Sequence, residues 1–169
     1  MDFVSVLVDF LENLSHDPVL YSIVFFIYSI AATTFLPIPI EIGLFFGQAS
    51  PIWLKALVLG AGKAVGSVLV FILGVHLENP LNQLGARWGW FRKFVELMHK
   101  FVAKTRYIGL YIILSIPLMV DTAPLYIFAI FNQEGLMCLR HFALTNFLAG
   151  ITRAFIVYLI FLYFGIMLV

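Results

Sequence analysis

Long hydrophobic runs separated by short polar stretches dominate the pattern along this chain. Two of these runs can cross a bilayer as single helices, and each has one charged residue near its middle, Lys63 in the first and Arg153 in the second. A full span needs ~20 mostly apolar residues, because each residue adds 1.5 Å across a hydrocarbon core of ~30 Å. We therefore predict transmembrane helices over residues 53–77 and 139–168.

Two further apolar runs, residues 18–50 and 107–134, are each interrupted by two prolines and one acidic residue. The interrupting residues are Pro37, Pro39 and Glu41 in the first run and Pro117, Asp121 and Pro124 in the second. Proline removes a backbone donor and breaks a helix, and backbone freed at membrane depth persists only inside protein or beside a wet cavity. One interpretation is two kinked helices. The other is two re-entrant hairpins, which the short stretch after each acid favours.

Amphipathic stretches complete the single membrane domain. Residues 1–17 combine acidic and apolar side chains, as an interfacial helix does. Residues 78–106 combine aromatic side chains with basic ones. This second pattern is typical of a helix on an anionic cytoplasmic leaflet. It is equally typical of a helix that packs on the core with its basic side in water. The predicted fold class is therefore an all-α integral membrane protein.

Composition narrows the function classes. Hydrophobic residues make up 63% of the chain and charged residues 11%, against ~25% charged in an average soluble domain. A globule of 169 residues has too much surface to hide that apolar content from water. A cytosolic enzyme, a nucleic-acid-binding domain and a secreted disulfide scaffold are therefore excluded.

The distribution of charge predicts an orientation. The first 17 residues carry four acids and no Lys or Arg, whereas residues 76–107 carry six basic residues and two acids. Because Lys and Arg collect in cytoplasmic loops, the central segment is expected in the cytoplasm of a multi-pass protein of the cell membrane. Lys55 runs against this orientation, since it falls on the predicted outer side.

No enzymatic motif is present. Cys138 is the single cysteine, which rules out an intrachain disulfide, and we interpret it as a small apolar filler. The four histidines are too scattered to indicate a metal site, and no nucleophile motif or phosphate-binding glycine loop occurs. We expect no enzymatic activity, no metal and no cofactor.

The two halves of the chain share an order of features. Each half has a proline-broken segment with its acid four residues after a proline, followed by a span that carries one cation. If the first broken segment enters from outside, the first span crosses inward and the second half is inverted. Inverted repeats with broken helices and polar groups near the midplane are typical of secondary transporters.

The charges inside the apolar runs are the candidate site. A charge at the bilayer centre costs ~2.5–3.5 kcal/mol, so four unpaired charges would cost roughly 10 kcal/mol. They must therefore meet one another, meet water or be neutralised. Helical spacing places Ser67 on the face of Lys63 and Asn146 on the face of Arg153. The predicted pathway residues are Glu41, Lys63, Asp121, Arg153, Asn146 and Ser67.

The residue types suggest roles for this site. Arg153 presents a planar fork that matches phosphate or carboxylate, and Lys63 supplies a second positive charge. Glu41 and Asp121 would hold the two cations when no substrate is bound. Desolvation and nearby cations act on these carboxyl groups in opposite directions. The hypothesis is an exchange of an anion for a proton at the midplane.

Residues 35–47 read FLPIPIEIGLFFG. This stretch resembles the first re-entrant motif of a known family, the DedA or VTT-domain (SNARE-associated Golgi protein) membrane proteins. Residues 60–74 read GAGKAVGSVLVFILG and resemble its glycine-rich span. Residues 117–131, with NFLAGITR at 146–153, are similar to its second loop and closing helix. The chain resembles most a small, divergent branch.

This resemblance implies two opposed re-entrant helices and movement of lipid across the bilayer. Bacterial members are associated with recycling polyprenyl phosphate carriers, often with proton coupling, and eukaryotic members with phospholipid scrambling. By position, Glu41 matches the first acid of the family and Asp121 the polar site of its second loop. The family's arginines within that loop are absent here, since none lies between Tyr107 and Asn132.

Other functions stay open at this point. The same cavity would suit an exporter of small molecules or ions, as described for similar small chains of the multidrug-export type. A non-transporting scaffold would use the charges only to pair helices, and an intramembrane enzyme acting on lipid lacks a nucleophile. The expected partners are membrane lipids with an anionic lipid as substrate, protons, and a second copy in a homodimer that shields the re-entrant loops.

Overall fold

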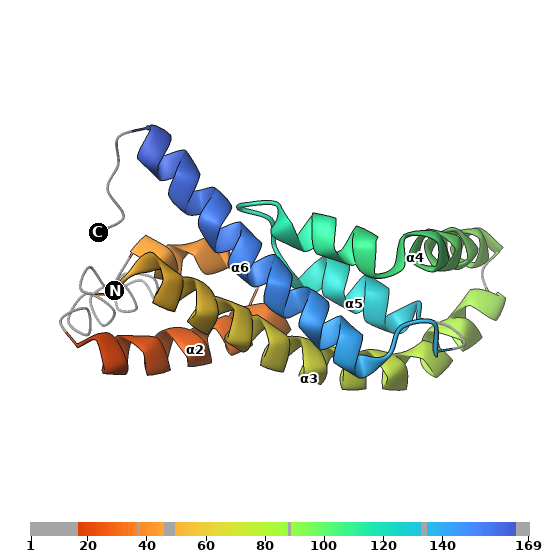
Figure 1. Cartoon of the computed structure of the whole chain (residues 1–169). Helices are drawn as coiled ribbons and strands as arrows, with labels where there is room; N and C mark the ends of the chain where they lie inside the picture. Colours follow the sequence, from red (N-terminus) through yellow and green to blue (C-terminus); the bar gives the residue numbers. More distant parts are fainter. Residues whose placement is uncertain (1–16, 37, 46–49, 88, 133–134, 165–169) are drawn as a thin grey trace, which may run out of the picture.

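The chain folds into helices that lie on either side of a crossing pair (Figure 1). The computed structural model describes residues 17–36, 38–45, 50–87, 89–132 and 135–164, and all regular structure within these ranges is helical. The elements are α2 (Pro18–Thr34), the 3-10 helix η1 (Ile40–Phe45), α3 (Ile52–Arg87), α4 (Gly89–Ser115), α5 (Thr122–Ile130) and α6 (Leu139–Tyr163). The predicted all-helical fold is thus confirmed. The predicted helix over residues 1–17 lies, apart from Asp17, outside the described residues.

Two helices are long and apolar enough to cross a membrane. They are the first part of α3, Ile52–Gly74, and the whole of α6, Leu139–Tyr163. These ranges lie close to the spans predicted from the apolar runs. Helix α3, however, continues beyond residue 77 as far as Arg87. Helical hydrogen bonds depend on the backbone rather than on hydropathy, so the end of an apolar run does not require the helix to end.

Helix α2 and η1 form a first hairpin, residues 18–45. Pro18 opens α2, and the Asp17 side chain caps it by accepting a hydrogen bond from the Val19 N–H at 2.9 Å. The chain then reverses, since the Tyr28 hydroxyl donates to the Pro39 carbonyl at 3.1 Å and the Tyr21 hydroxyl donates to the Gly43 carbonyl. These bonds place η1 antiparallel to α2, which supports a hairpin rather than a kinked helix.

A second hairpin, residues 107–130, comprises the last part of α4 and α5. It begins after a sharp break in α4, where Arg106 has φ 43° and ψ −134°. The chain returns along α4, because the rings of Phe101 and Phe128 lie 5.8 Å apart and the Phe131 carbonyl lies 3.2 Å from His99 Nδ1. The second broken segment is therefore also a hairpin, and its returning arm is an α-helix.

Close helix contacts depend on small residues. A Cβ atom added at Gly62 would lie 2.5 Å from the Ser29 Cβ, and one added at Gly66 would lie 2.8 Å from the Thr33 Cβ. Because the earlier glycine of α3 meets the earlier residue of α2, the two helices run parallel. The small pair Gly62 and Gly66 thus lets the backbone of α2 approach closely.

The hairpins contribute to two separate hydrophobic cores. The first core packs hairpin 1 against the start of α3 and the end of α6 and includes Phe25, Leu44, Leu59 and Val157. The second core packs hairpin 2 against Val70 of α3 and the start of α6 and includes Leu114, Phe128 and Phe142. The two hairpins point toward each other from opposite ends of α3 (Figure 1). The polar site lies where their tips meet.

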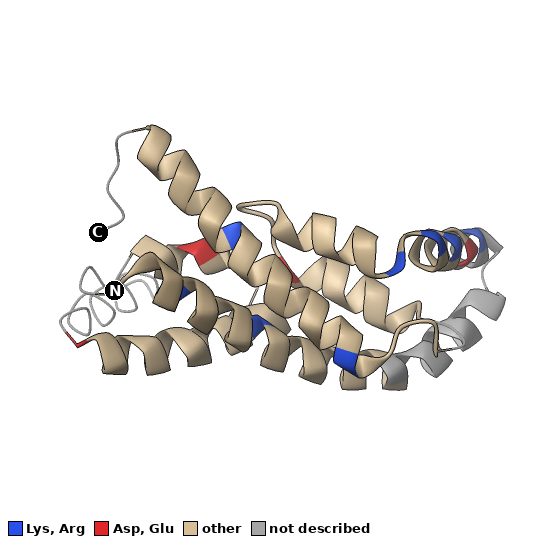
Figure 2. Cartoon of the chain, viewed as in Figure 1, with Lys and Arg blue, Asp and Glu red and all other residues tan. Residues whose placement is uncertain are grey.

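The first part of α4 carries the exposed basic residues. Val102 and Met98 pack on the second core, whereas Lys93, Lys100 and Lys104 are exposed on the opposite side. Figure 2 shows the blue of these residues gathered on this part of the helix. For these side chains, the arrangement matches the interpretation of a helix that packs on the core with its basic side outward.

Candidate functional site

Arg153 lies at the centre of the site and contacts both hairpins. Its side chain is 1% exposed. The Nε–H donates to Glu41 Oε1 of hairpin 1. The Nη1–H donates to Asp121 Oδ1 at 2.5 Å, and the Nη2–H donates to the Met119 carbonyl, both in hairpin 2. One guanidinium fork therefore joins the tips of two hairpins that are far apart in sequence.

Lys63 supplies the second positive charge from α3. Its Nζ atom lies 3.0 Å from Asp121 Oδ2 and donates to the Leu114 carbonyl at 3.3 Å. The side chain is fully buried. Asp121 therefore bridges the two cations, one through each carboxylate oxygen.

Glu41 links the two hairpin tips a second time. Its Oε1 atom accepts a hydrogen bond from the Leu118 N–H at 2.8 Å as well as from Arg153. Leu118 has φ 61°, a left-handed conformation that costs a non-glycine residue free energy. The bond to Glu41 helps to hold this turn. The other oxygen, Oε2, is buried and has no hydrogen-bond partner within the described part of the chain.

The four charges balance. Two cations and two carboxylates give no net formal charge, and the four side chains are at most 3% exposed. The expectation that these charges meet agrees with this geometry. Removing one partner of a buried ion pair costs about 3–5 kcal/mol, whereas replacing a whole pair by apolar residues is often neutral. Stability alone therefore gives little reason for a site of this kind.

A close crossing of α3 and α6 lies beside the charges. A Cβ atom added at Gly60 would lie 2.9 Å from the Phe147 carbonyl, and one added at Gly150 would lie 2.9 Å from the Gly60 Cα. Lys63 and Arg153 each follow three residues after one of these glycines. Each cation therefore lies about one helical turn beyond the crossing point.

The predicted helix breakers occupy the hairpin turns or their edges. Pro39 accepts the Tyr28 hydrogen bond through its carbonyl, and Pro117 lies in the tip of hairpin 2. Pro124 is buried in the first turn of α5, where a missing N–H leaves no helical bond unmade. Pro37 lies outside the described residues.

Asn146 and Ser67 are buried but bond locally. The Asn146 Nδ2 atom donates to the Phe142 carbonyl at 2.9 Å, and the Ser67 hydroxyl donates to the Ala64 carbonyl at 2.7 Å. Among the described contacts, neither side chain bonds to the four charges. The Asn146 Oδ1 atom is buried without a hydrogen-bond partner in the described residues, so it is an acceptor within the seam between α3 and α6. Their place in a pathway stays a prediction.

Sequence reasoning missed the backbone groups of the site and misread one side chain. The Leu118 N–H and the Met119 carbonyl belong to a turn whose conformation could not be predicted from the residue types in it. Cys138 is exposed rather than a buried filler, and its Sγ atom lies 2.7 Å from His141 Nδ1. Hydrogen bonding to the His141 backbone and imidazole lowers the pKa of the Cys138 thiol to about 7. The filler interpretation is therefore wrong, because Cys138 is exposed at the N-terminal end of α6.

Comparisons with protein-family models, curated proteins and solved structures find no match for this chain.

Proposed function

We propose that this chain is a multi-pass membrane protein that moves an anionic lipid, a polyprenyl phosphate or a phospholipid, between leaflets. The observation that carries the proposal is the buried, charge-balanced site in which Arg153 joins the tips of two opposed hairpins. In this topology α3 and α6 span the bilayer, and the hairpins are re-entrant from opposite sides. Each hairpin followed by its span forms one unit of an inverted repeat. The basic start of α4 faces the cytoplasm.

The formal charges of the four side chains suggest a mechanism for the proposed transport. The cluster has two positive and two negative formal charges, so a bound monoanion leaves it one negative charge in excess. Adding a proton to one carboxylate restores neutrality in a region where net charge is costly. Glu41 Oε2 is the acceptor for that proton, since it is buried and has no donor in the described residues. The Nε–H of Arg153, freed from Glu41, then donates to the anion.

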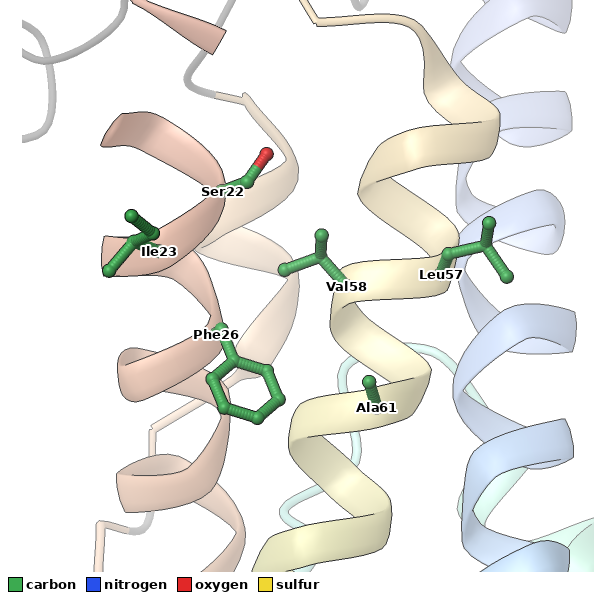
Figure 3. Close-up of a pocket in the computed structure, with 6 residues that line it drawn as sticks. All are labelled: Ser22, Ile23, Phe26, Leu57, Val58 and Ala61. Carbon is green, nitrogen blue, oxygen red and sulfur yellow. The ribbon is translucent and has the colours of Figure 1, made fainter. Parts of the chain in front are cut away.

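An apolar groove on the surface supports a lipid as the transported molecule. A groove of about 410 Å³ runs between α2 and α3 and is almost entirely apolar, as an acyl chain requires. In Figure 3, Phe26 and Val58 point toward the gap between these helices. The lining residues are Ser22, Ile23, Phe26, Leu57, Val58 and Ala61. The resemblance to the DedA or VTT-domain family is a second support. It also suggests the alternative of a small-molecule exporter, which needs closed walls around the path.

Reconstitution tests the proposal directly. Liposomes with a headgroup-labelled phosphatidylglycerol report leaflet exchange by quenching with a membrane-impermeant reductant. We expect Arg153→Met to reduce exchange at least tenfold and Arg153→Lys to retain part of it. Arg140→Met is the matched control, because Arg140 lies on the same helix and is exposed. Unchanged exchange in Arg153→Met would overturn the proposal.

A pH gradient tests the proton. We expect Glu41→Gln to exchange lipid at a rate that no longer responds to the gradient. An unchanged response in both Glu41→Gln and Asp121→Asn would remove proton coupling from the mechanism.

One observation favours a scaffold as the second candidate. The four charges are already paired and closed off, as in a site that only fixes helix pairing. Replacement of all four charges, by Glu41→Leu, Lys63→Met, Asp121→Leu and Arg153→Met, separates the two candidates. A scaffold tolerates this complete apolar replacement with its assembly intact, whereas a transporter loses lipid exchange while remaining folded.

A further inference from the structure

A third buried cation lies apart from the central site. Lys55, in the first turn of α3, is 1% exposed. Its Nζ atom donates to the Leu44 carbonyl at 3.1 Å and lies 5.9 Å from the centre of the Tyr21 ring. The ammonium group is therefore held between α2, η1 and α3 by one neutral acceptor and one ring face.

Within the part of the chain that the structure describes, no carboxylate balances this charge. Within the described residues, no acidic side chain forms an ion pair with Lys55, and the central site already balances its own two cations. The ammonium has three N–H donors, of which one meets the Leu44 carbonyl. Ser50, one turn earlier, is also buried, and its hydroxyl has no hydrogen-bond partner in the described part of the chain. Buried charges of this kind are usually paired, because the unpaired ion is costly.

We propose that Lys55 is a second anion-binding residue, which binds a phosphate-type oxyanion at the end of the molecule where α3 begins. A charged oxygen replaces the Leu44 carbonyl as the acceptor, since charge-assisted hydrogen bonds are roughly twice as strong as neutral ones. For the Leu44 carbonyl to leave Lys55, η1 must move, and this element is only six residues long. Release of the Leu44 carbonyl then opens the space beside Lys55.

The position of Lys55 places this site on the way to the central one. Lys55 and Lys63 are eight residues apart on α3, which corresponds to a rise of about 12 Å. An anion that approaches from the hairpin 1 end would meet Lys55 before it reaches Lys63 and Arg153. Binding at Lys55 does not depend on movement of lipid across the bilayer, so it stands apart from the proposed transport.

Counting retained lipids tests the inference. The full chain is extracted in a neutral detergent with phosphatidylglycerol, and native mass spectrometry counts the bound lipids. We expect Lys55→Met to lose one retained lipid and Lys55→Arg to keep it. Lys100→Met, at an exposed lysine, is the matched control and should retain the wild-type number. Retention of the wild-type number by Lys55→Met would exclude phosphatidylglycerol as the ligand.

Two further measurements distinguish a lipid headgroup from free phosphate, and binding at Lys55 from the proposed transport. Titration of delipidated protein with inorganic phosphate at constant ionic strength should raise the Tm if free phosphate binds. Lys55→Met should weaken that response at least tenfold in phosphate concentration. A lipid count that depends on Lys55 without any phosphate response assigns the site to a lipid headgroup. Arg153→Met should keep the lipid held by Lys55, so loss of transport leaves this binding intact. If neither phosphate nor phosphatidylglycerol binding depends on Lys55, the inference fails.

Discussion

Lys63 and Arg153 occupy corresponding positions in the two halves of the molecule, three residues after the glycines at which α3 and α6 cross. Their contacts differ. Lys63 forms an ion pair only with Asp121 of hairpin 2, whereas Arg153 contacts carboxylates of both hairpins and the Met119 carbonyl. A point charge serves one partner, and a planar fork with five donors serves three. The comparison indicates that a repeated framework can hold a site in which one half carries most of the contacts.

The two acids, Asp121 and Glu41, also differ in the number of cations that they contact. Asp121 contacts both cations, while Glu41 contacts one cation and one backbone N–H. Asp121 lies just before α5, and Glu41 lies inside η1. Half two therefore contributes both the residue that bridges the cations and the cation that bridges the hairpins. The predictions below test this asymmetry.

Removal of the central cation should have the largest effect. Arg153→Met leaves Glu41 with no cation and Asp121 with one, so we expect a loss of about 3–5 kcal/mol in unfolding free energy. Lys63→Met leaves Asp121 paired with Arg153 and should cost clearly less. Unfolding in mixed micelles by denaturing detergent measures both. Equal losses, or a larger loss in Lys63→Met, would contradict the assignment of Arg153 as the joint between the hairpins.

Neutralisation of the acids should give the next largest difference. Asp121→Asn weakens two ion pairs and should cost about 3 kcal/mol or more. Glu41→Gln keeps an acceptor for the Leu118 N–H and should cost about 2 kcal/mol, as for a hydrogen bond to a charged group. The same unfolding measurement applies. If Glu41→Gln proves the more damaging, hairpin 1 rather than hairpin 2 carries the site.

The crossing glycines should behave alike. Gly60→Ala and Gly150→Ala each place a methyl group against the backbone or side chains of the facing helix, and each should cost about 1–3 kcal/mol. Because both changes separate the same pair of helices, the double variant should cost less than the sum. Melting temperatures in one detergent check all three proteins. Strict additivity would show that the two glycines do not share one contact.

The residues at the starts of the two spans, Ser50 and Cys138, should differ in their reactivity toward an alkylating agent, with no change in the stability of the protein. Helix α3 begins beside a buried Ser50, whereas α6 begins at the exposed Cys138. With the Cys138 pKa lowered to about 7, the thiolate predominates above that pH and the thiol below it. Alkylation by iodoacetamide should therefore reach half of its maximal rate near pH 7. His141→Ala should shift the midpoint upward by removing the imidazole contact, and an unshifted midpoint would exclude the His141 imidazole as a cause.

The fold was predictable from sequence where local rules apply. Long apolar runs identify α3 and α6, because only a helix satisfies its own backbone at that length. Pro39 and Pro117 mark turns where the chain does not continue as a helix, whereas Pro124 lies inside the first turn of α5. The extension of α3 to Arg87 was not predictable, since polar residues leave the choice between helix and loop open.

The site was predictable in its members more than in its contacts. Charges inside apolar runs must be compensated, and this requirement alone selected Glu41, Lys63, Asp121 and Arg153. It did not identify which acid meets which base. Nor did it indicate that Lys55 is buried, because a lysine near the end of a span is expected to lie at the membrane interface.

By itself, therefore, the sequence determined the helical class, the two apolar helices, the break points and the set of charges that needed partners. These depend on residue type and spacing within a short stretch of chain. Only the tertiary structure decided that Arg153 joins both hairpins, that Leu118 and Met119 contribute backbone groups, and that Lys55 lies buried without a carboxylate among the described residues. The contacts of Arg153 and Glu41 join residues 32 to 112 positions apart, and their geometry follows from how the two hairpins pack against the crossing of α3 and α6.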